Sequence, residues 1–123
     1  AYTTLFRSQN VNLNDCIFTI LQCLSHISEK HYYGVTILVD VLRGAQSKRI
    51  TDAELDKIPE YGKLGMLDRE SVVYIVEWLL EQHYILKTKH PKYPVLHPTY
   101  EGMHYKESIT EELLKELAEK LRG

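Results

Sequence analysis

The sequence predicts an α+β fold in which helices come first, a two-stranded β-hairpin follows, and one more helix ends the chain. Two observations lead to this prediction. Apolar residues recur at three- and four-residue spacing in four separate stretches, the pattern of a helix with one buried face. Between the third and fourth stretches, residues 83–102 alternate in polarity and contain three prolines, which is typical of a short hairpin with exposed edges.

Length and composition are those of one small globular domain. The chain has 123 residues, of which 44% are apolar and 26% are charged, and its formal net charge is −2. Its longest apolar runs fall short of the ~18–20 residues that a membrane helix needs, and its start lacks a secretory signal pattern. We therefore expect a protein of the cytoplasm, or of the nucleus in a eukaryote. Cys16 and Cys23 lack the spacing of a zinc knuckle or a disulfide framework, so we expect buried free thiols.

The first two helices are predicted on either side of a short polar link. Residues 1–11 show no period and are predicted to be an N-terminal lead-in. The first helix follows, with Asn14 or Asp15 as its cap. The second helix ends at Gly44, which can adopt the left-handed conformation that closes a helix. The apolar positions that predict these two helices are Ile17, Ile20, Leu21, Leu24, Ile27, Ile37, Leu38, Val41 and Leu42.

Two further helical segments are predicted from capping sequences. Thr51 to Glu54 has the form of a capping box, which predicts a short helical segment that stops near Pro59. Asp68 is the predicted cap of a third helix, whose apolar residues between positions 72 and 80 form a broad face. Within this helix, Trp78 is expected to lie in the core.

The order of the elements is that of a winged helix, a helix-turn-helix followed by a β-hairpin wing. A last amphipathic helix is predicted to open at Ser108 to Glu111 and to continue through Leu121. The predicted fold is therefore an α+β winged helix with an extra C-terminal helix. We divide the chain into a lead-in at 1–11, a winged-helix domain at 12–105 and the added helix at 106–123.

Three stretches make the chain resemble one winged-helix family. The stretch "YYGVTILVDVLRGAQSKRI" at 32–50 places an aromatic residue and a glycine before an apolar helix, then Leu-Arg-Gly, a small polar stretch and a basic residue. Tyr61-Gly62 stands before the third helix, and "LHPTYEG" at 96–102 closes the wing. Together these features, over roughly Asn14 to Gly102, resemble the winged-helix part of the RecQ C-terminal (RQC) domain found in RecQ-family DNA helicases.

The resemblance implies the DNA-binding module of an ATP-dependent helicase with roles in DNA repair, recombination and replication. Such a helicase carries its ATPase in upstream domains that use ATP and Mg²⁺, and many members hold a four-cysteine zinc site between those domains and the winged helix. This chain has no phosphate loop ending in Gly-Lys-Ser/Thr and only two cysteines, so we expect neither a catalytic residue nor a cofactor in it. Its expected partners are the upstream helicase domains and duplex, forked or junction DNA.

The residues after the second helix form the first candidate DNA-binding group. Arg43, Lys48 and Arg49 stand close together with no acid among them, and cations that lie on phosphates gain affinity by releasing counterions. Gly44 would keep the backbone close to the DNA, and Ser47 would add a hydroxyl donor. Such contacts position DNA without reading its sequence. In the alternative, Arg43 binds carbonyls at the end of its own helix and Lys48 is only solvated.

A second group is predicted at the start of the third helix. Free backbone amides and the helix dipole favour a phosphate there, close to Arg69, although Asp68 competes for the same amides. Residues 72–75 give this helix little polar chemistry for base edges. We therefore do not expect it to read a DNA sequence.

The wing carries the third group. Lys87, Lys89 and Lys92 surround the hairpin loop and are predicted to contact phosphates. The RecQ-family resemblance implies an aromatic or histidine side chain near the hairpin tip that wedges against the terminal base pair; we carry this role over to Tyr93, with His90 as the substitute. Stacking on an unpaired base contributes about 1–3 kcal/mol, comparable to opening one base-pair step. In the alternative, Tyr93 folds back onto the sheet.

Two other functions fit a winged helix. A transcription regulator would place polar side chains along the third helix and use a dimer surface, which the last leucine-rich helix could supply. A protein-interaction module would use the wing lysines on an acidic partner. No catalytic set emerges, because the scattered histidines have no acid or cysteine at ligand spacing. These histidines are His26, His31, His83 and His104.

Overall fold

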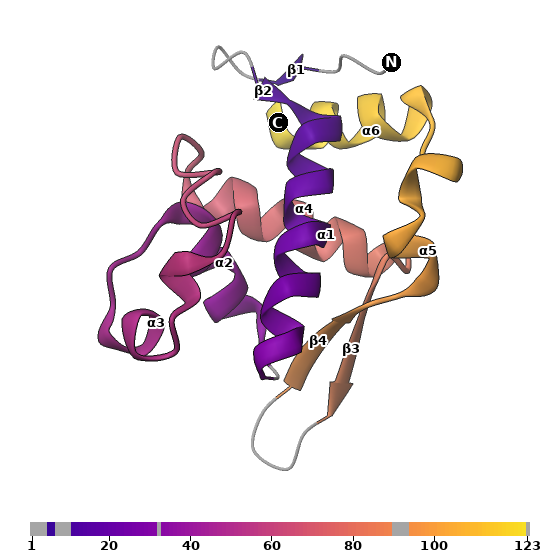
Figure 1. Ribbon diagram of the computed structural model, residues 1–123. Coiled ribbons are helices and arrows are strands. Elements are labelled where there is room, and N and C mark those ends of the chain that lie inside the picture. The colour runs from indigo at the N-terminus through magenta and orange to yellow at the C-terminus, as the bar shows by residue number, and fades with distance from the viewer. Residues whose placement is uncertain (1–4, 7–10, 32, 90–93, 123) are drawn as a thin grey trace.

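The computed structural model describes residues 5–6, 11–31, 33–89 and 94–122, and its elements are arranged as a winged helix (Figure 1). Helix α1 (Leu13–Lys30) runs through the middle of the molecule, and helix α4 (Arg69–Glu81) crosses it. Helices α2 (Val35–Arg43) and α3 (Lys48–Asp52) lie on one side of α1, and the two-stranded wing extends on the other (Figure 1). The predicted α+β winged-helix fold is confirmed.

Helix α1 begins at Leu13 because Asn12 caps it. The Asn12 backbone is extended, and its side-chain oxygen accepts a hydrogen bond from the Asp15 amide at 3.3 Å. The prediction that Asn14 or Asp15 is the cap is therefore wrong. Leu13 is fully buried, so the apolar face of the helix starts before either predicted cap.

Helix α2 (Val35–Arg43) ends at Gly44, as predicted. Gly44 has a φ of +77°. The amides of Gly44 and Ala45 donate to the carbonyls of Val41 and Asp40 at 3.1 and 2.9 Å. The left-handed glycine thus supplies donors to carbonyls that have no partner within the helix.

Helix α3 (Lys48–Asp52) is capped by Ser47, whose hydroxyl oxygen accepts a hydrogen bond from the Ile50 amide at 3.4 Å. Thr51 lies inside α3, and its hydroxyl donates to the Lys48 carbonyl at 3.1 Å. The predicted capping box at Thr51 is therefore wrong. Helix α3 begins before Thr51, at Lys48, and this places Ile50 in the core. The 3₁₀ helix η2 (Leu55–Lys57) occupies the rest of the predicted segment.

Helix α4 follows Asp68, as predicted, but the Asp68 side chain makes no capping hydrogen bond to the helix backbone. Its carboxylate accepts a hydrogen bond from the Ser71 hydroxyl at 2.5 Å. The apolar face of α4 packs against α2 and the wing. Trp78 is 2% exposed and lies in the core, as predicted.

The wing is the predicted antiparallel hairpin, made of strands β3 (Ile85–Lys89) and β4 (Pro94–Pro98). Lys87 lies opposite Leu96 in the register. The Leu96 amide donates to the Tyr33 carbonyl at 2.9 Å. This hydrogen bond ties β4 to the link between α1 and α2, so the wing has a fixed place beside the helices.

Two short helices that the sequence did not predict follow the wing: α5 (Tyr100–Met103) and the 3₁₀ helix η3 (Tyr105–Glu107). The hydroxyl of Thr99 caps α5 by accepting the Gly102 amide at 2.9 Å. A Cβ atom on Gly102 would lie 2.0 Å from the Tyr84 carbonyl oxygen. Only glycine allows this close approach, which explains the last residue of the "LHPTYEG" stretch.

Helix α6 (Glu111–Arg122) begins at Glu111, the last residue of the predicted opening stretch, and Thr110, not Ser108, supplies the hydroxyl at its start. The Leu113 amide donates to the Thr110 hydroxyl at 3.2 Å. The Ser108 hydroxyl lies 3.0 Å from the hydroxyl of Tyr84, so it joins the segment between η3 and α6 to the residue that precedes β3.

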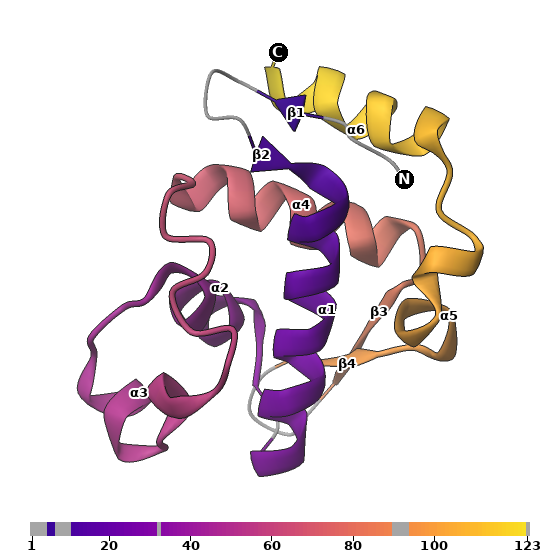
Figure 2. The same ribbon diagram turned by 45° about the horizontal axis from the view of Figure 1, so that its top comes forward.

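The last helix lies near the start of α1 and beside β1 (Figure 2), and its buried residues belong to the same core as the rest of the chain. Helix α6 contacts α1, α4 and strand β1, and Leu114 and Leu117 are fully buried. Strands β1 (Leu5–Phe6) and β2 (Val11–Asn12) pair antiparallel, so the predicted lead-in contains a small hairpin beside α6. Among the described residues, no helix is long and apolar enough to cross a membrane.

Candidate nucleic-acid interface

The three cations predicted to bind DNA after α2 are exposed. Arg43, Lys48 and Arg49 all have exposed side chains, and Ser47 is exposed as well. We call residues 43–49 the basic segment. It comprises the last residue of α2, the connection and the first two residues of α3. Because Ser47 accepts the Ile50 amide, its hydroxyl proton stays available to a phosphate oxygen.

Tyr61 and Gly62 hold the basic segment in place. The Tyr61 hydroxyl lies within hydrogen-bond distance of the Gly44 and Ala45 carbonyls, at 3.0 and 2.9 Å. The Gly62 amide donates to the Val41 carbonyl at 2.9 Å. A Cβ atom on Gly44 would lie 3.2 Å from the Gly62 Cα, so two glycine backbones pack against each other. The Leu-Arg-Gly and Tyr-Gly stretches of the sequence are thus two sides of one contact.

Arg43 has a structural contact that neither sequence hypothesis foresaw. Its Nε donates to the Leu67 carbonyl at 3.1 Å, across to the segment that precedes α4. It does not bind the carbonyls of its own helix through this group. Since the side chain is exposed and a guanidinium has five N–H donors, Arg43 can hold this carbonyl and still present donors to a phosphate.

The start of α4 is less favourable for a phosphate than the sequence suggested. Arg69 pairs with Asp40 of α2, with 2.5 Å between Nη1 and Oδ1. Asp68 and Glu70 flank Arg69 and are both exposed. The charge of Arg69 is therefore offset within the protein, and the two neighbouring carboxylates add repulsion for an anion.

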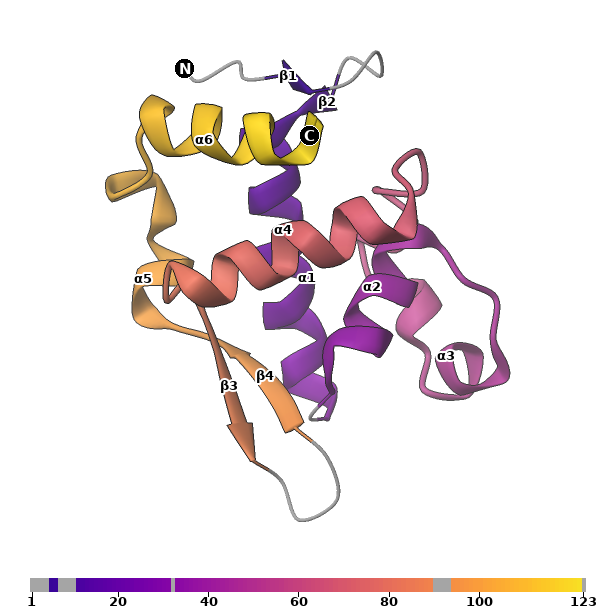
Figure 3. The ribbon, with the colours of Figure 1, turned by 180° about the vertical axis from the view of Figure 1, so that it is seen from behind.

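The outward face of α4 is acidic. Its exposed residues after Arg69 are Glu70, Tyr74, Glu77 and Glu81. This helix occupies the position from which a winged helix would enter the major groove, and it lies across one face of the molecule (Figure 3). Carboxylates along such a face repel the phosphates that line the groove, because like charges at short range are unfavourable.

The wing presents further cations. Lys87 and Lys89 on β3 are both exposed. Lys92, His90 and Tyr93 lie outside the described residues, so their predicted contacts with DNA stay predictions.

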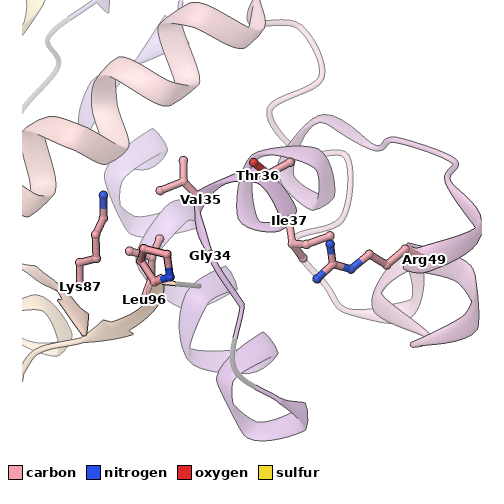
Figure 4. Close-up of a pocket in the computed structure, with 8 residues that line it drawn as sticks. Gly34, Val35, Thr36, Ile37, Arg49, Lys87 and Leu96 are labelled. Atoms are coloured by element: carbon pink, nitrogen blue, oxygen red, sulfur yellow. The ribbon is translucent and has the colours of Figure 1, made fainter. Parts of the chain in front are cut away.

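Arg49 of the basic segment and Lys87 of the wing line the same pocket (Figure 4). These two residues are 38 positions apart in the sequence, and they were assigned to separate groups by their local patterns. The fold brings them to one surface, on which the start of α2 lies between them. Two of the three predicted groups thus belong to one basic surface, whereas Arg69 is drawn into an ion pair.

One polar pair was missed by the sequence patterns. His26 Nδ1 lies 2.6 Å from Glu60 Oε1, and Glu60 is 6% exposed. The two residues are 34 positions apart in the sequence, so no local spacing pattern could have predicted that they pair. The pair fixes the segment before Tyr61 to α1. Because Tyr61 in turn contacts the Gly44 and Ala45 carbonyls, the pair helps to fix the position of the basic segment relative to α1.

The two thiols are buried and free, as predicted. Burial raises the pKa of Cys16 to about 12, with a smaller contribution from the charge of Asp15. Burial also raises the pKa of Cys23, and the charge of Glu60 adds to the effect. Neither thiol is a nucleophile at neutral pH. Within the described ranges, no group of three or more His, Cys, Asp or Glu side chains is placed to hold a metal ion.

Comparison with known families gives one match. The family model described as the RQC domain matches residues 7–119. The match extends beyond positions 14–102, where the sequence resemblance was assigned, and it reaches into α6. No curated protein matches the sequence closely enough to be counted as a relative.

Proposed function

The chain belongs to the RQC domain family, the C-terminal DNA-binding module of RecQ helicases, and on that premise we propose how it binds DNA. The basic segment and the wing lie on the sugar–phosphate backbone of a duplex at a fork or an end. The wing faces the terminal base pair and assists strand separation. Binding is selective for DNA structure and tolerant of sequence.

The separation of charge on the surface carries this proposal. Exposed cations gather on the basic segment and the wing, at Arg43, Lys48, Arg49, Lys87 and Lys89, while the exposed face of α4 is acidic. Neutralising a phosphate releases its counterions and adds affinity for any sequence. A surface that binds backbone and keeps its groove-facing helix acidic has little means to read base edges.

The same features argue against a transcription regulator. Such a protein would read bases from α4, whose exposed side chains here are mostly carboxylates. It would also need a dimer surface, which the leucines of α6 were expected to supply. Leu114 and Leu117 are instead fully buried in the chain's own core, so they are not available to a second copy.

We assign the wedge at the hairpin tip to Tyr93, with His90 as its substitute. The assignment rests on the family resemblance and on the antiparallel pairing of β3 and β4, which flank residues 90–93 in the chain. A ring stacked on a terminal base would contribute about 1–3 kcal/mol. In the parent helicase, the upstream domains would supply ATP hydrolysis with Mg²⁺, and in many members of the family a zinc site.

The salt dependence of DNA binding tests the proposal. Fluorescence anisotropy would follow binding to one duplex in forked and blunt forms and to a scrambled sequence at several salt concentrations. Lys48→Ala with Lys89→Ala should lower the slope of log K against log salt by about 0.9 for each lost phosphate contact, equally for all sequences.

Lys115→Ala is the matched control, because Lys115 is exposed on α6, at the other end of the molecule from the wing. It removes one lysine charge, as each of the two other substitutions does, and it should leave the slope unchanged. An equal change of slope in Lys115→Ala would show that only net charge matters. A preference for one sequence over its scrambled form would contradict the proposed mode of binding.

A further inference from the structure

A pocket of about 480 Å³ lies between the start of α2, the start of α3 and the wing (Figure 4). Its size falls within the range of about 300–1,000 Å³ that is usual for small-ligand sites. None of the described residues that line it is acidic. They are Gly34, Val35, Thr36, Ile37, Arg49, Lys87, Pro94 and Leu96.

The walls of the pocket are held in place by backbone contacts. The Leu96 amide donates to the Tyr33 carbonyl at 2.9 Å. A Cβ atom on Gly34 would lie 3.0 Å from the Pro94 carbonyl oxygen, so the chain before α2 is packed closely against β4. The pocket is therefore formed by fixed elements of the fold.

The pocket combines an apolar floor with two cations. Val35 and Leu96 lie between Lys87 on one side and Arg49 on the other, and the Arg49 guanidinium points toward Ile37 (Figure 4). The first turn of α2 also lines it; this turn contains no acid, and the cap residue Gly34 makes no side-chain hydrogen bond to it. The positive end of the helix dipole thus adds to the two charges.

We propose that this pocket binds one nucleotide of the unpaired strand that leaves the wing. The apolar floor would lie under the base, while the first amides of α2, with Arg49 and Lys87 at the border between the pocket and the duplex surface, would hold the adjoining phosphates. A duplex encloses its bases and offers only its backbone to a surface, so it would leave the apolar floor uncovered. An unpaired base presents its ring face, and single-strand sites combine such a surface with a positively charged groove.

This inference rests on the proposed function, since the strand reaches the pocket only when a fork lies at the wing. Thr36→Glu provides the test, because Thr36 is exposed, lines the pocket and lies in the first turn of α2. An acid in a first helical turn is compatible with the helix dipole, so the variant should fold. It would, however, repel a phosphate. Thr36→Gln is the matched control of similar size without the charge.

Binding of the wild-type chain and both variants would be measured by anisotropy on a forked duplex, its blunt counterpart and a single strand. Thr36→Glu should weaken binding to the fork and the single strand about tenfold more than Thr36→Gln does, because only the glutamate repels a phosphate, and both variants should change binding to the blunt duplex by less than about twofold. Abasic sites at the first unpaired positions of the fork should weaken wild-type binding, since the floor would then lose its base.

The outcomes separate this inference from the proposed function. If Thr36→Glu weakens all three DNA forms equally, the pocket belongs to the duplex surface, which overturns the single-strand assignment and leaves the proposed function standing. Unchanged binding in all forms overturns the pocket as a site. Failure of the wild-type chain to bind any DNA at low salt would overturn both.

Discussion

Removing the hydroxyl of Tyr61 tests whether the basic segment must be held in place to bind DNA. Tyr61→Phe keeps the ring and loses the contacts with the Gly44 and Ala45 carbonyls, at 3.0 and 2.9 Å. One hydroxyl proton shared by two carbonyls counts as one hydrogen bond. The free energy of unfolding should therefore fall by about 0.5–1.5 kcal/mol, a change that urea denaturation can resolve.

The same change should weaken DNA binding without removing a charge. A segment that loses its anchor must be ordered again when DNA binds, and fixing the backbone of one residue costs about 1–2 kcal/mol. If one residue is freed, DNA affinity should fall by about five- to thirtyfold. The salt slope should stay as in the wild type, because Arg43, Lys48 and Arg49 are all still present.

Tyr84→Phe is the matched control. It also removes a tyrosine hydroxyl, which lies 3.0 Å from the Ser108 hydroxyl between η3 and α6. Its effect on stability should be of the same order, and its effect on DNA affinity should be absent. If Tyr61→Phe binds DNA as the wild type does, or if both variants lose affinity equally, the anchoring role of Tyr61 is refuted.

Three other changes probe separate parts of the structure. Asp40→Asn should free Arg69 from its ion pair, raising DNA affinity and steepening the salt slope by up to about 0.9 in the anisotropy assay; an unchanged slope would show that Arg69 does not reach DNA. Gly102→Ala should cost about 3 kcal/mol or more in urea denaturation, because its Cβ would lie 2.0 Å from the Tyr84 carbonyl oxygen; a loss below about 1 kcal/mol would contradict this contact. Burial raises the pKa of Cys16 from 9.0 to about 12, so its contribution to stability is complete below pH 9 and declines as pH rises toward 12. The difference in unfolding free energy between the wild type and Cys16→Ala should therefore shrink over that range, and a constant difference would contradict the raised pKa.

The helices that bury a periodic apolar face could be predicted from the sequence because periodicity is local. Leu24, Leu42 and Leu79 all lie where the pattern placed them, fully buried in one core. Helix starts were less predictable, since short polar residues occur at several adjacent positions. Ser47 and Thr51 both offer a hydroxyl in the sequence, but in the fold only Ser47 accepts from a later amide, that of the buried Ile50, whereas the Thr51 hydroxyl donates to the Lys48 carbonyl.

The parts of the candidate site that could not be predicted depend on residues far apart in the chain. The sequence indicated a basic segment and a basic wing, but not that Arg49 and Lys87 line one pocket. It placed Arg69 at a helix start without showing that Asp40 would pair with it. Helix α5 was missed because its four residues are too few to show a helical period.

An NMR titration of the ¹⁵N-labelled chain with a forked duplex tests the central claim most directly, because it reports where the DNA lies residue by residue. The account predicts that the largest shifts fall on amides of residues 44–49, the first turn of α2 and strand β3. Amides on the acidic face of α4, at Tyr74, Glu77 and Glu81, should hardly change. The largest shifts along α4, with small shifts at 44–49 and in the wing, would contradict it.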